Sequence, residues 1–406
     1  MYLNRFIYNY FLILFVLIPV SLIVGSAAAL VNILMIDISF IALIFFKKNF
    51  RFLKNKTIIY LLILYLYLFL NTLISLDYTQ GISRNLGFLR MIILFLAFNY
   101  FFYQKLFFDK MIKYWLIIFL IVVIDVFIEY SFGKNILGYG KELYGNRIVS
   151  FFKDEPIVGG YINGFFLIII GFFLNKDSKY NYFFIILSII FLTAIILTGE
   201  RSNSIKAVLG LSVLLILYKN IKFKYKVVFF SSISLIFLFL LMNSSFLKLR
   251  YIHQIKTSLG NESIYLKLYQ SGLQVFKNNI VFGVGNKNYR VETCNQNDEQ
   301  SSKNVDKYIC TTHPHQIYFD FLSEHGLFGT FIIMFIFYKL IFSKIKETCI
   351  KKNYLQLGAL IYLIIVFTPI IPSGAFFNNY TLTIFIINLS IFYATGSNIN
   401  LFKSNN

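Results

Sequence analysis

Two of the four histidines of the chain stand two residues apart in the segment THPHQIYFDFLSEHGLFGTF, residues 312–331. Thr311 and Thr312 offer side-chain oxygens for a helix cap and Pro314 suits a first helical position, so the sequence predicts a helix that begins here. His315 would lie in its first turn, where the positive helix end disfavours the imidazolium ion. A neutral imidazole beside free backbone N–H groups could accept a proton next to a bound anion.

Two glycines extend the pattern from His315. On helical spacing His315, Phe319, Leu322, Gly326 and Gly329 share one stripe, and the glycines would let another backbone approach closely. A base at a membrane surface beside an anion site is one interpretation. A polar interfacial histidine without function is the other, and it is the more common case for a histidine alone.

The other histidines and the cysteines show weaker patterns. His313 would point away from His315, and no motif surrounds His253. The histidine pair with Cys294 and Cys310 could be drawn as a zinc site, but the spacing matches no usual zinc pattern. We therefore expect no metal.

Hydrophobic segments must position these residues. The chain has 406 residues, of which 58% are hydrophobic and 14% charged, unlike a soluble domain. The sequence predicts an all-α integral membrane protein, with residues 1–406 forming a single polytopic domain. A transmembrane helix needs roughly 20 mostly apolar residues, and candidates lie near residues 6–24, 27–46, 57–75, 88–103, 111–129, 158–174, 181–197, 203–218, 227–243, 316–340, 354–371 and 380–396, twelve in all.

The basic residues indicate how the transmembrane helices are oriented. The net charge is +20, but Lys and Arg are spread between the apolar segments, so we expect contact with membrane lipids and none with nucleic acid. With the N-terminus inside, 21 basic residues fall on inner segments and six on short outer loops, as the positive-inside rule requires. Both termini would then face the cytoplasm, and residues 244–314 would form one large periplasmic loop of a bacterial inner-membrane protein.

The cysteines fit this orientation. Cys294 and Cys310 fall in the large outer loop, whereas Cys349 falls on an inner segment. The first two can pair in an oxidising periplasm, and closing a loop of this size would stabilise it by about 3 kcal/mol in the chain-entropy model. We expect a Cys294–Cys310 disulfide, with two free thiols as the alternative.

The segment around His315 resembles a known family signature. The run of His315, Gln316, nine residues, Gly326, two residues and Gly329 is similar to the signature of the O-antigen ligase and O-antigen polymerase superfamily of bacterial membrane glycan transferases. It also falls where that family has it, after a large outer loop. Three further stretches resemble the family, namely NRIVSFFKDEPIVGGYI at 146–162, TGERSNS at 198–204 and FKNNIVFGVGNKNY at 276–289, so the resemblance covers residues 146–340.

The resemblance implies a metal-independent glycosyltransferase without a cofactor. It would transfer a glycan from an undecaprenyl diphosphate carrier at the periplasmic face, with His315 deprotonating the acceptor hydroxyl. The leaving diphosphate needs cations near it. Arg201 and Arg147 are the candidates, because a guanidinium group makes paired bonds to phosphate oxygens.

Both arginines have a structural alternative. Arg201 could pair with Glu200 or extend toward the membrane surface. Arg147 could pair with Asp154 or Glu155.

The loop helix departs from the family pattern. Members often carry an arginine four residues before a tryptophan there, and Tyr265 and Tyr269 hold those places. Lys267, Arg250 or Arg290 could substitute for the missing cation.

Several acidic residues remain to be explained. Glu324 could orient cations or acceptor hydroxyls, or it could be a structural cap or ion pair. Asp37, Asp125 and Glu129 lie within or at the ends of apolar segments, where acids are often functional. In a transporter they would be coupling sites, and Asp37 has no other explanation in the sequence.

The acceptor would distinguish two enzymes of lipopolysaccharide biosynthesis. An O-antigen ligase uses the lipid A core, whereas an O-antigen polymerase uses another carrier-linked repeat, and FFKDEPIVGGY slightly favours the polymerases. A chain-length regulator could be a further partner. The alternative is a membrane transporter or a flippase for lipid-linked glycans, but transporters are often built from internal repeats, and the sequence shows none.

Overall fold

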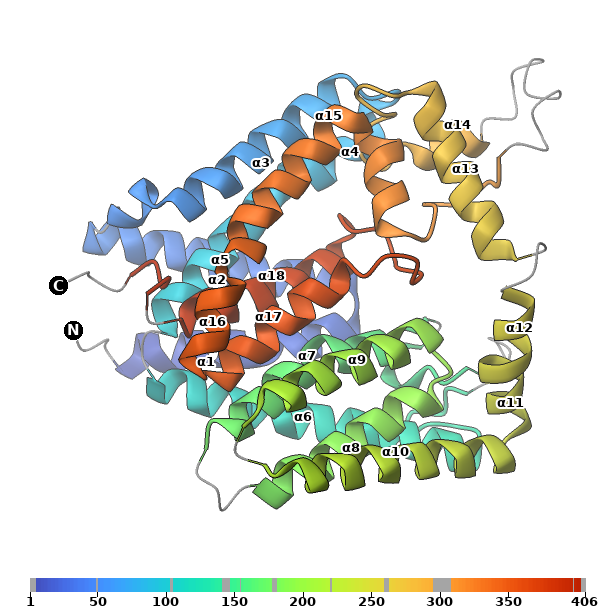
Figure 1. Ribbon diagram of the computed structural model, residues 1–406. Coiled ribbons are helices and arrows are strands. Elements are labelled where there is room, and N and C mark those ends of the chain that lie inside the picture. Colours follow the sequence, from blue (N-terminus) through green and yellow to red (C-terminus); the bar gives the residue numbers. More distant parts are fainter. Residues whose placement is uncertain are drawn as a thin grey trace.

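The computed structural model is all-helical in the residues that it describes (Figure 1), which are 5–48, 50–102, 105–140, 147–153, 155–176, 181–219, 221–258, 263–294, 308–396 and 398–402. Every apolar segment predicted to span a membrane is a helix. These helices are α1 (Arg5–Val24), α2 (Ser26–Lys47), α3 (Lys56–Leu73), α5 (Phe88–Phe101), α6 (Lys105–Phe132), α7 (Val158–Leu174), α8 (Asn181–Leu197), α9 (Arg201–Leu217), α10 (Phe223–Asn243), α15 (Ile317–Leu340), α17 (Tyr354–Val366) and α18 (Asn379–Ala394).

Short helices connect them. They are η1 (Arg51–Lys54), α4 (Tyr78–Leu86), η3 (Ser150–Phe152), α11 (Ser245–Lys248), η5 (Leu249–His253), α12 (Gln254–Ser258), α13 (Ile264–Asn278), α14 (Tyr289–Cys294), η7 (Phe342–Lys344) and α16 (Ile345–Lys351). The helices α11 to α14 all belong to the large loop predicted between residues 244 and 314.

Seven helical segments in the described part of the chain are long and apolar enough to cross a membrane, and four further apolar helices are shorter. In hydrocarbon every backbone N–H and C=O must be satisfied within the protein, and a helix does so internally. The chain is therefore an all-helical, multi-pass membrane protein.

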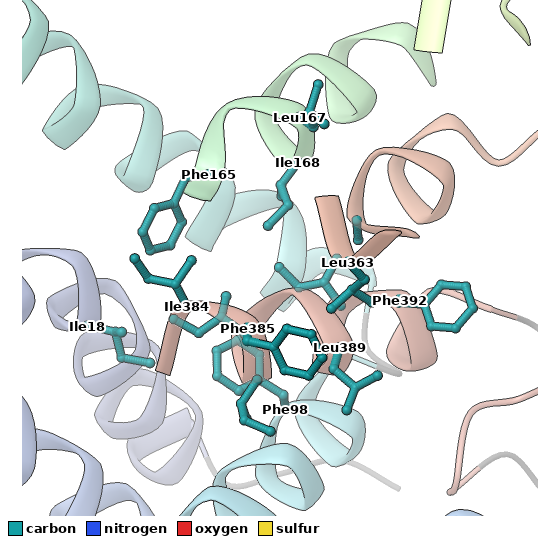
Figure 2. Close-up of a cluster of buried hydrophobic side chains, with 14 of the residues drawn as sticks. Ile18, Phe98, Phe165, Leu167, Ile168, Leu363, Ile384, Phe385, Leu389 and Phe392 are labelled. Atoms are coloured by element: carbon teal, nitrogen blue, oxygen red, sulfur yellow. The ribbon is translucent and has the colours of Figure 1, made fainter. Parts of the chain in front are cut away.

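The core lies where α1, α5, α7, α17 and α18 meet (Figure 2). Ile18, Phe98, Phe165, Leu363 and Phe385 come from these five helices and are all buried. Two glycines allow α7 and α17 to touch, because a Cβ at Gly171 would strike the backbone of Tyr354 and one at Gly358 would strike the backbone of Leu167. Such small-residue contacts are typical of membrane helix packing.

The outer segment that follows α6 is held by the two acids near the end of that helix. Asp125 accepts hydrogen bonds from the hydroxyl of Ser150 at 2.6 Å and from the backbone N–H of Ile136 at 2.9 Å. Glu129 accepts the backbone N–H groups of Val149 and Ser150 at 3.1 and 2.6 Å. These bonds explain why α6 carries two acids in its last third.

Candidate active site

A cavity of about 870 Å³ opens beside the residues that precede α15. Its size is in the range of ligand-binding pockets. The charged side chains that line it are mostly cationic, and they are Arg84, Arg90, Arg147, Lys153, Arg201, Lys206 and Arg250 against Glu155 and Glu200. This excess of positive charge favours an anionic ligand.

His315 lines the cavity, but it does not lie in the first turn of a helix. The helix α15 begins at Ile317, and its N-cap is Gln316. The Gln316 side-chain oxygen accepts the backbone N–H groups of Tyr318 and Phe319 at 2.8 and 3.0 Å. The side-chain amide of Gln316, four residues after Thr312, therefore supplies the cap that the sequence assigned to threonine hydroxyls.

The predicted cap at Thr311 and Thr312, with Pro314 in the first turn, was consequently wrong. His315 has a φ of 57°, in the left-handed region that non-glycine residues rarely adopt. Its carbonyl accepts the backbone N–H of Ser373 at 2.9 Å. The predicted helical stripe from His315 to Gly326 does not exist, because His315 precedes the helix.

His313 was expected to point away from His315, and this expectation was wrong as well. The two imidazole rings have centroids 4.1 Å apart, and both side chains line the cavity. The His313 Nδ1 lies 2.9 Å from the Thr312 hydroxyl. Its Nε2 is buried without a hydrogen-bond partner among the described residues.

Burial keeps both imidazoles neutral. Desolvation, with a smaller effect of the neighbouring His313, lowers the pKa of His315 to about 4. Desolvation also lowers the pKa of His313 to about 4, with the positive charge of Arg84 acting in the same direction. His315 is thus a neutral imidazole at pH 7, as predicted, but burial is the cause and the helix dipole is not.

Three arginines form a cluster in the cavity wall. Arg147 and Arg201, both predicted to bind substrate, line it together with Arg250. Burial lowers the pKa of Arg250 first, and the charges of Arg147 and Arg201 lower it further, which shows that the three lie near one another. A guanidinium group stays protonated in such surroundings.

Backbone and side-chain acceptors orient this arginine cluster. Arg250 donates its Nε–H to the carbonyl of Gly199 at 3.1 Å and an Nη1–H to Gln254 at 2.6 Å. Arg147 donates an Nη2–H to the carbonyl of Pro156 at 2.9 Å, and its Nε is buried without a partner among the described residues.

Glu200 tethers the start of α7 to the same wall. Its carboxylate accepts the backbone N–H groups of Gly159 and Gly160 at 2.7 and 3.0 Å and the Asn203 amide at 2.7 Å. Burial raises the pKa of Glu200, whereas Arg147 and the Gly159 N–H oppose this rise.

The two ion pairs in the described part of the chain, Lys176 with Asp109 and Lys351 with Glu347, do not include Arg147. The alternative partner Asp154 lies outside the described residues.

The loop helix α13 brings its tyrosines to the mouth of the site. Tyr265 lines the cavity, and its ring meets that of His315 edge-on at a centroid distance of 6.5 Å. Tyr269 donates its hydroxyl to the carbonyl of Ile370 at 3.0 Å and packs on Phe319. Among the three cations that could replace the missing loop arginine, namely Lys267, Arg250 and Arg290, only Arg250 lines the cavity.

The motif glycines allow other segments to pack closely against α15. Gly326 has φ 63° and ψ −168°, so it interrupts the helix, and a Cβ there would strike the backbone of Val281. Across this break the N–H groups of Leu327 and Phe328 bond the carbonyls of Ile280 and Val281 at 2.8 and 3.1 Å. Gly329 leaves room for the Tyr67 hydroxyl of α3, which runs beside α15 (Figure 1).

The stretch FKNNIVFGVGNKNY, residues 276–289, continues this contact on the other side of the break. The N–H of Gly285 bonds the Glu324 carbonyl at 2.9 Å, and the N–H of Asn286 bonds the Asn71 side chain of α3 at 2.8 Å. The Asn286 side chain also bonds Asn85 of α4. The loop motif thus fastens α15 to the corner between α3 and α4.

Two residues predicted to bind substrate lie elsewhere. Glu324 is 4% exposed and accepts the backbone N–H of Tyr289 at 3.4 Å, at the contact between α15 and the loop. Arg290 is exposed on α14, and neither side chain lines the cavity. Their proposed roles remain untested predictions, to which this position lends no support.

Cys294 and Cys310 form a disulfide, with their Cα atoms 4.8 Å apart. A disulfide sulfur is no thiolate, so the two cannot serve the zinc site considered from the sequence. Within the described part of the chain, no three His, Cys, Asp or Glu side chains come together as a potential metal site.

Four cations of the cavity were not predicted to act there, namely Arg84, Arg90, Lys153 and Lys206. Arg90 and Lys206 fall inside apolar segments, and an intramembrane charge is a signal that could have identified them. Arg90 lies close enough to Asp37 for the two side chains to act on each other across the α2–α5 contact, but both Asp37 carboxyl oxygens are buried without a hydrogen-bond partner among the described residues.

Comparison with known families agrees with this geometry. Residues 186–334 match the family model for O-antigen ligase, whereas no curated protein matches the sequence. The matched region extends from α8 into α15 and contains Arg201, Arg250 and His315. Residues 186–334 of this multi-pass membrane protein therefore match an O-antigen ligase domain.

Proposed function

We propose that the protein transfers a glycan from an undecaprenyl diphosphate carrier to a sugar hydroxyl at the periplasmic face of the bacterial inner membrane. The observation that carries the proposal is the single cavity in which His315, held neutral by burial, faces Arg147, Arg201 and Arg250. A base and a cationic cluster are what this transfer requires.

His315 takes the proton of the acceptor hydroxyl. The acceptor oxygen then forms a bond to the anomeric carbon of the donor, and the bond from that carbon to the diphosphate oxygen breaks. The diphosphate leaves with the bonding electrons. Arg147, Arg201 and Arg250 stabilise the charge that develops on the diphosphate, because each guanidinium group can donate two parallel hydrogen bonds to phosphate oxygens.

The orientation is part of the same proposal. With twelve transmembrane helices and both termini in the cytoplasm, the segments that carry Arg84, Arg147, Arg201, Arg250 and His315 all fall on the periplasmic side. All five side chains line one cavity, which supports this assignment, since they would otherwise be divided between two faces of the membrane.

The acceptor is either the lipid A core, as in an O-antigen ligase, or a carrier-linked repeat, as in an O-antigen polymerase. A polymerase would work with a chain-length regulator. Transport has less support, because Asp125 and Glu129 bond the outer segment, and of these three acids only Asp37 is buried without a hydrogen-bond partner among the described residues.

The test uses cells that lack the protein and cells that carry His315→Ala or His253→Ala at equal abundance. His253 is exposed and does not line the cavity, so His253→Ala is the matched control. We expect His315→Ala to reduce transfer at least about 100-fold, because general base catalysis contributes on that order. The readouts are a gel of surface lipopolysaccharide and analysis of the carrier-lipid pool.

The products then identify the acceptor. Core that bears a single repeat indicates a polymerase, whereas bare core with long glycan on the carrier indicates a ligase. Full activity of His315→Ala would contradict its role as the base. An unchanged profile and pool in cells that lack the protein would contradict the function itself.

A further inference from the structure

A second cationic group lines the cavity apart from the arginine cluster. Arg84 lies on α4 and Arg90 on α5, whereas Arg147, Arg201 and Arg250 come from the segments next to α7, α9 and η5. Figure 1 shows α4 and α5 on the α3 and α15 side of the molecule, and α7 to α12 on the other. The cavity therefore has two charged walls.

The histidine pair lies between these walls. On one side Tyr265 meets His315 at a centroid distance of 6.5 Å, and Tyr265 is close enough to Arg250 to act on its charge. On the other side His313 stacks near His315 at 4.1 Å, and Arg84 acts on His313. The order across the cavity is arginine cluster, histidine pair, Arg84.

The wall around Arg84 has polar groups without partners. Arg84 makes no hydrogen bond or ion pair with any described residue, and it is half-buried. Nearby groups of the lining also have buried polar atoms that lack a hydrogen bond to the described residues, namely Arg90 Nε, His313 Nε2, Ser373 Oγ and Tyr380 Oη. Buried polar groups are normally satisfied, so this wall is suited to a polar ligand.

The charge balance points to an anion as that ligand. Seven cations and two carboxylates line the cavity, and the diphosphate of the donor neutralises only part of the excess. Arg90 lies near the buried carboxyl group of Asp37, and Arg84 lies near the buried carboxyl groups of Asp320 and Glu324. Arg84 nevertheless forms no ion pair or hydrogen bond with a described residue, so its N–H groups can bond an added anion.

We propose that Arg84, assisted by Arg90, binds an acidic group on the acceptor glycan, either a carboxylate or a phosphate ester near the attacking hydroxyl. The inference rests on the proposed function. A base that deprotonates the acceptor lies between acceptor and donor, so the wall opposite the diphosphate cluster is where the acceptor binds. The substrate class is thus an acidic polysaccharide.

Arg84 favours an acidic acceptor because binding of a neutral sugar at the same place costs free energy. A neutral sugar at this position would leave a half-buried guanidinium group without a directly bonded anion, and sites built for a polar group reject analogues that lack it. The expected discrimination is at least tenfold in the concentration at which sugars compete.

The first experiment is mass spectrometry of the acceptor glycan, taken as the core or carrier-linked repeat that the lipopolysaccharide gel identifies. We expect a uronic acid or a sugar phosphate at or beside the sugar that receives the glycan, and the mass distinguishes the two sources. An acceptor made only of neutral sugars at these positions overturns the proposal.

The second experiment measures transfer by the full-length protein in proteoliposomes, with carrier-linked glycan extracted from His315→Ala cells. The competitors are methyl glucuronoside, glucose 6-phosphate and neutral methyl glucoside. We expect an acidic competitor to inhibit at a concentration at least tenfold lower than the neutral one, and this preference to disappear in Arg84→Gln. The variant Arg84→Lys retains the charge and should retain part of the preference.

Lys277→Gln is the matched control, because it removes an exposed cation of the loop helix that does not line the cavity. It should keep the wild-type preference. A preference that persists in Arg84→Gln means that acidic sugars compete at the diphosphate cluster, and this result overturns the inference. If transfer depends on His315 but acidic and neutral competitors inhibit it equally, the inference about Arg84 is wrong and the proposed function stands. If the wild type shows no transfer, the proposed function is wrong.

Discussion

Burial keeps the imidazoles of His313 and His315 unprotonated at neutral pH. Each ring loses water contact in the cavity wall, and in addition His313 lowers the proton affinity of His315 and Arg84 lowers that of His313. The outcome is a pKa of about 4 for both, against the ordinary value of 6.5. His315 therefore remains in its proton-accepting form throughout the neutral range.

We expect the acid limb of the transfer rate to have its midpoint near pH 4. Because the pKa of His315 is lowered to about 4, the base stays unprotonated from pH 7 down to about pH 5. Initial rates in proteoliposomes as a function of pH provide the measurement. A midpoint at 6.5, the value of a solvated imidazole, would show that His315 is not buried during turnover.

The same shift has a consequence for stability. Between pH 6.5 and about 4 the unfolded chain binds protons at both histidines and the folded chain does not, so the free energy of unfolding decreases as the pH falls through this window. His313→Gln removes one of the two titrating groups and should reduce this acid sensitivity.

The break in α15 at Gly326 determines how the loop packs against α15, α3 and α4, and these elements position the residues of the site. Residues 279–286 bond to both sides of Gly326 and to α3 and α4. The helix α4 carries Arg84, and the segment before α15 carries His315. The loop motif thus sets the distance between the acceptor wall and the base.

Gly326→Ala should destabilise the protein by at least about 2 kcal/mol, because a side chain at φ 63° is strained and would strike the Val281 backbone. The measurement is the thermal unfolding of the purified protein in detergent, together with its transfer rate. Gly374→Ala is the control, since a Cβ there meets only the Thr381 hydroxyl at an ordinary 3.6 Å. Equal unfolding temperatures for Gly326→Ala and the wild type would refute this role of the break.

The whole molecule has a cavity whose charged residues converge from distant parts of the chain. Helices α7, α17 and α18 form a tightly packed centre, and the charged walls lie around one end of it. The distribution of basic residues predicts that this end faces the periplasm. The native Cys349 offers a direct reporter, because it is the free cysteine among the described residues.

We expect Cys349 to react with a membrane-impermeant maleimide only after the membrane is permeabilised, since it lies on an inner segment. In the variant Lys277→Cys, the new exposed cysteine on α13 should react in intact spheroplasts. Mass shift of the labelled protein on a gel is the measurement. Labelling of Cys349 in intact spheroplasts, with protection of Lys277→Cys, would reverse the orientation and place the cavity in the cytoplasm.

Much of the architecture was predictable because it depends on local properties of the chain. A run of apolar residues long enough for a bilayer must form a helix, whatever surrounds it, and all the apolar segments from Arg5 to Ala394 did so. The spacing of His315, Gly326 and Gly329 identified the family without a structure, since a signature is a property of sequence alone. Cys294 and Cys310 stood close enough in one loop for their pairing to be expected.

The tertiary structure decided what the local sequence could not. The left-handed backbone of His315 and the break at Gly326 depend on Ser373 and Val281, which lie far away in the chain. The acceptor wall at Arg84 and its distance from Arg250 arise only when α4 and η5 fold around the same cavity. Charges at remote sequence positions act on one another only through the distances that packing sets, and for this reason the second anion site was invisible in the sequence.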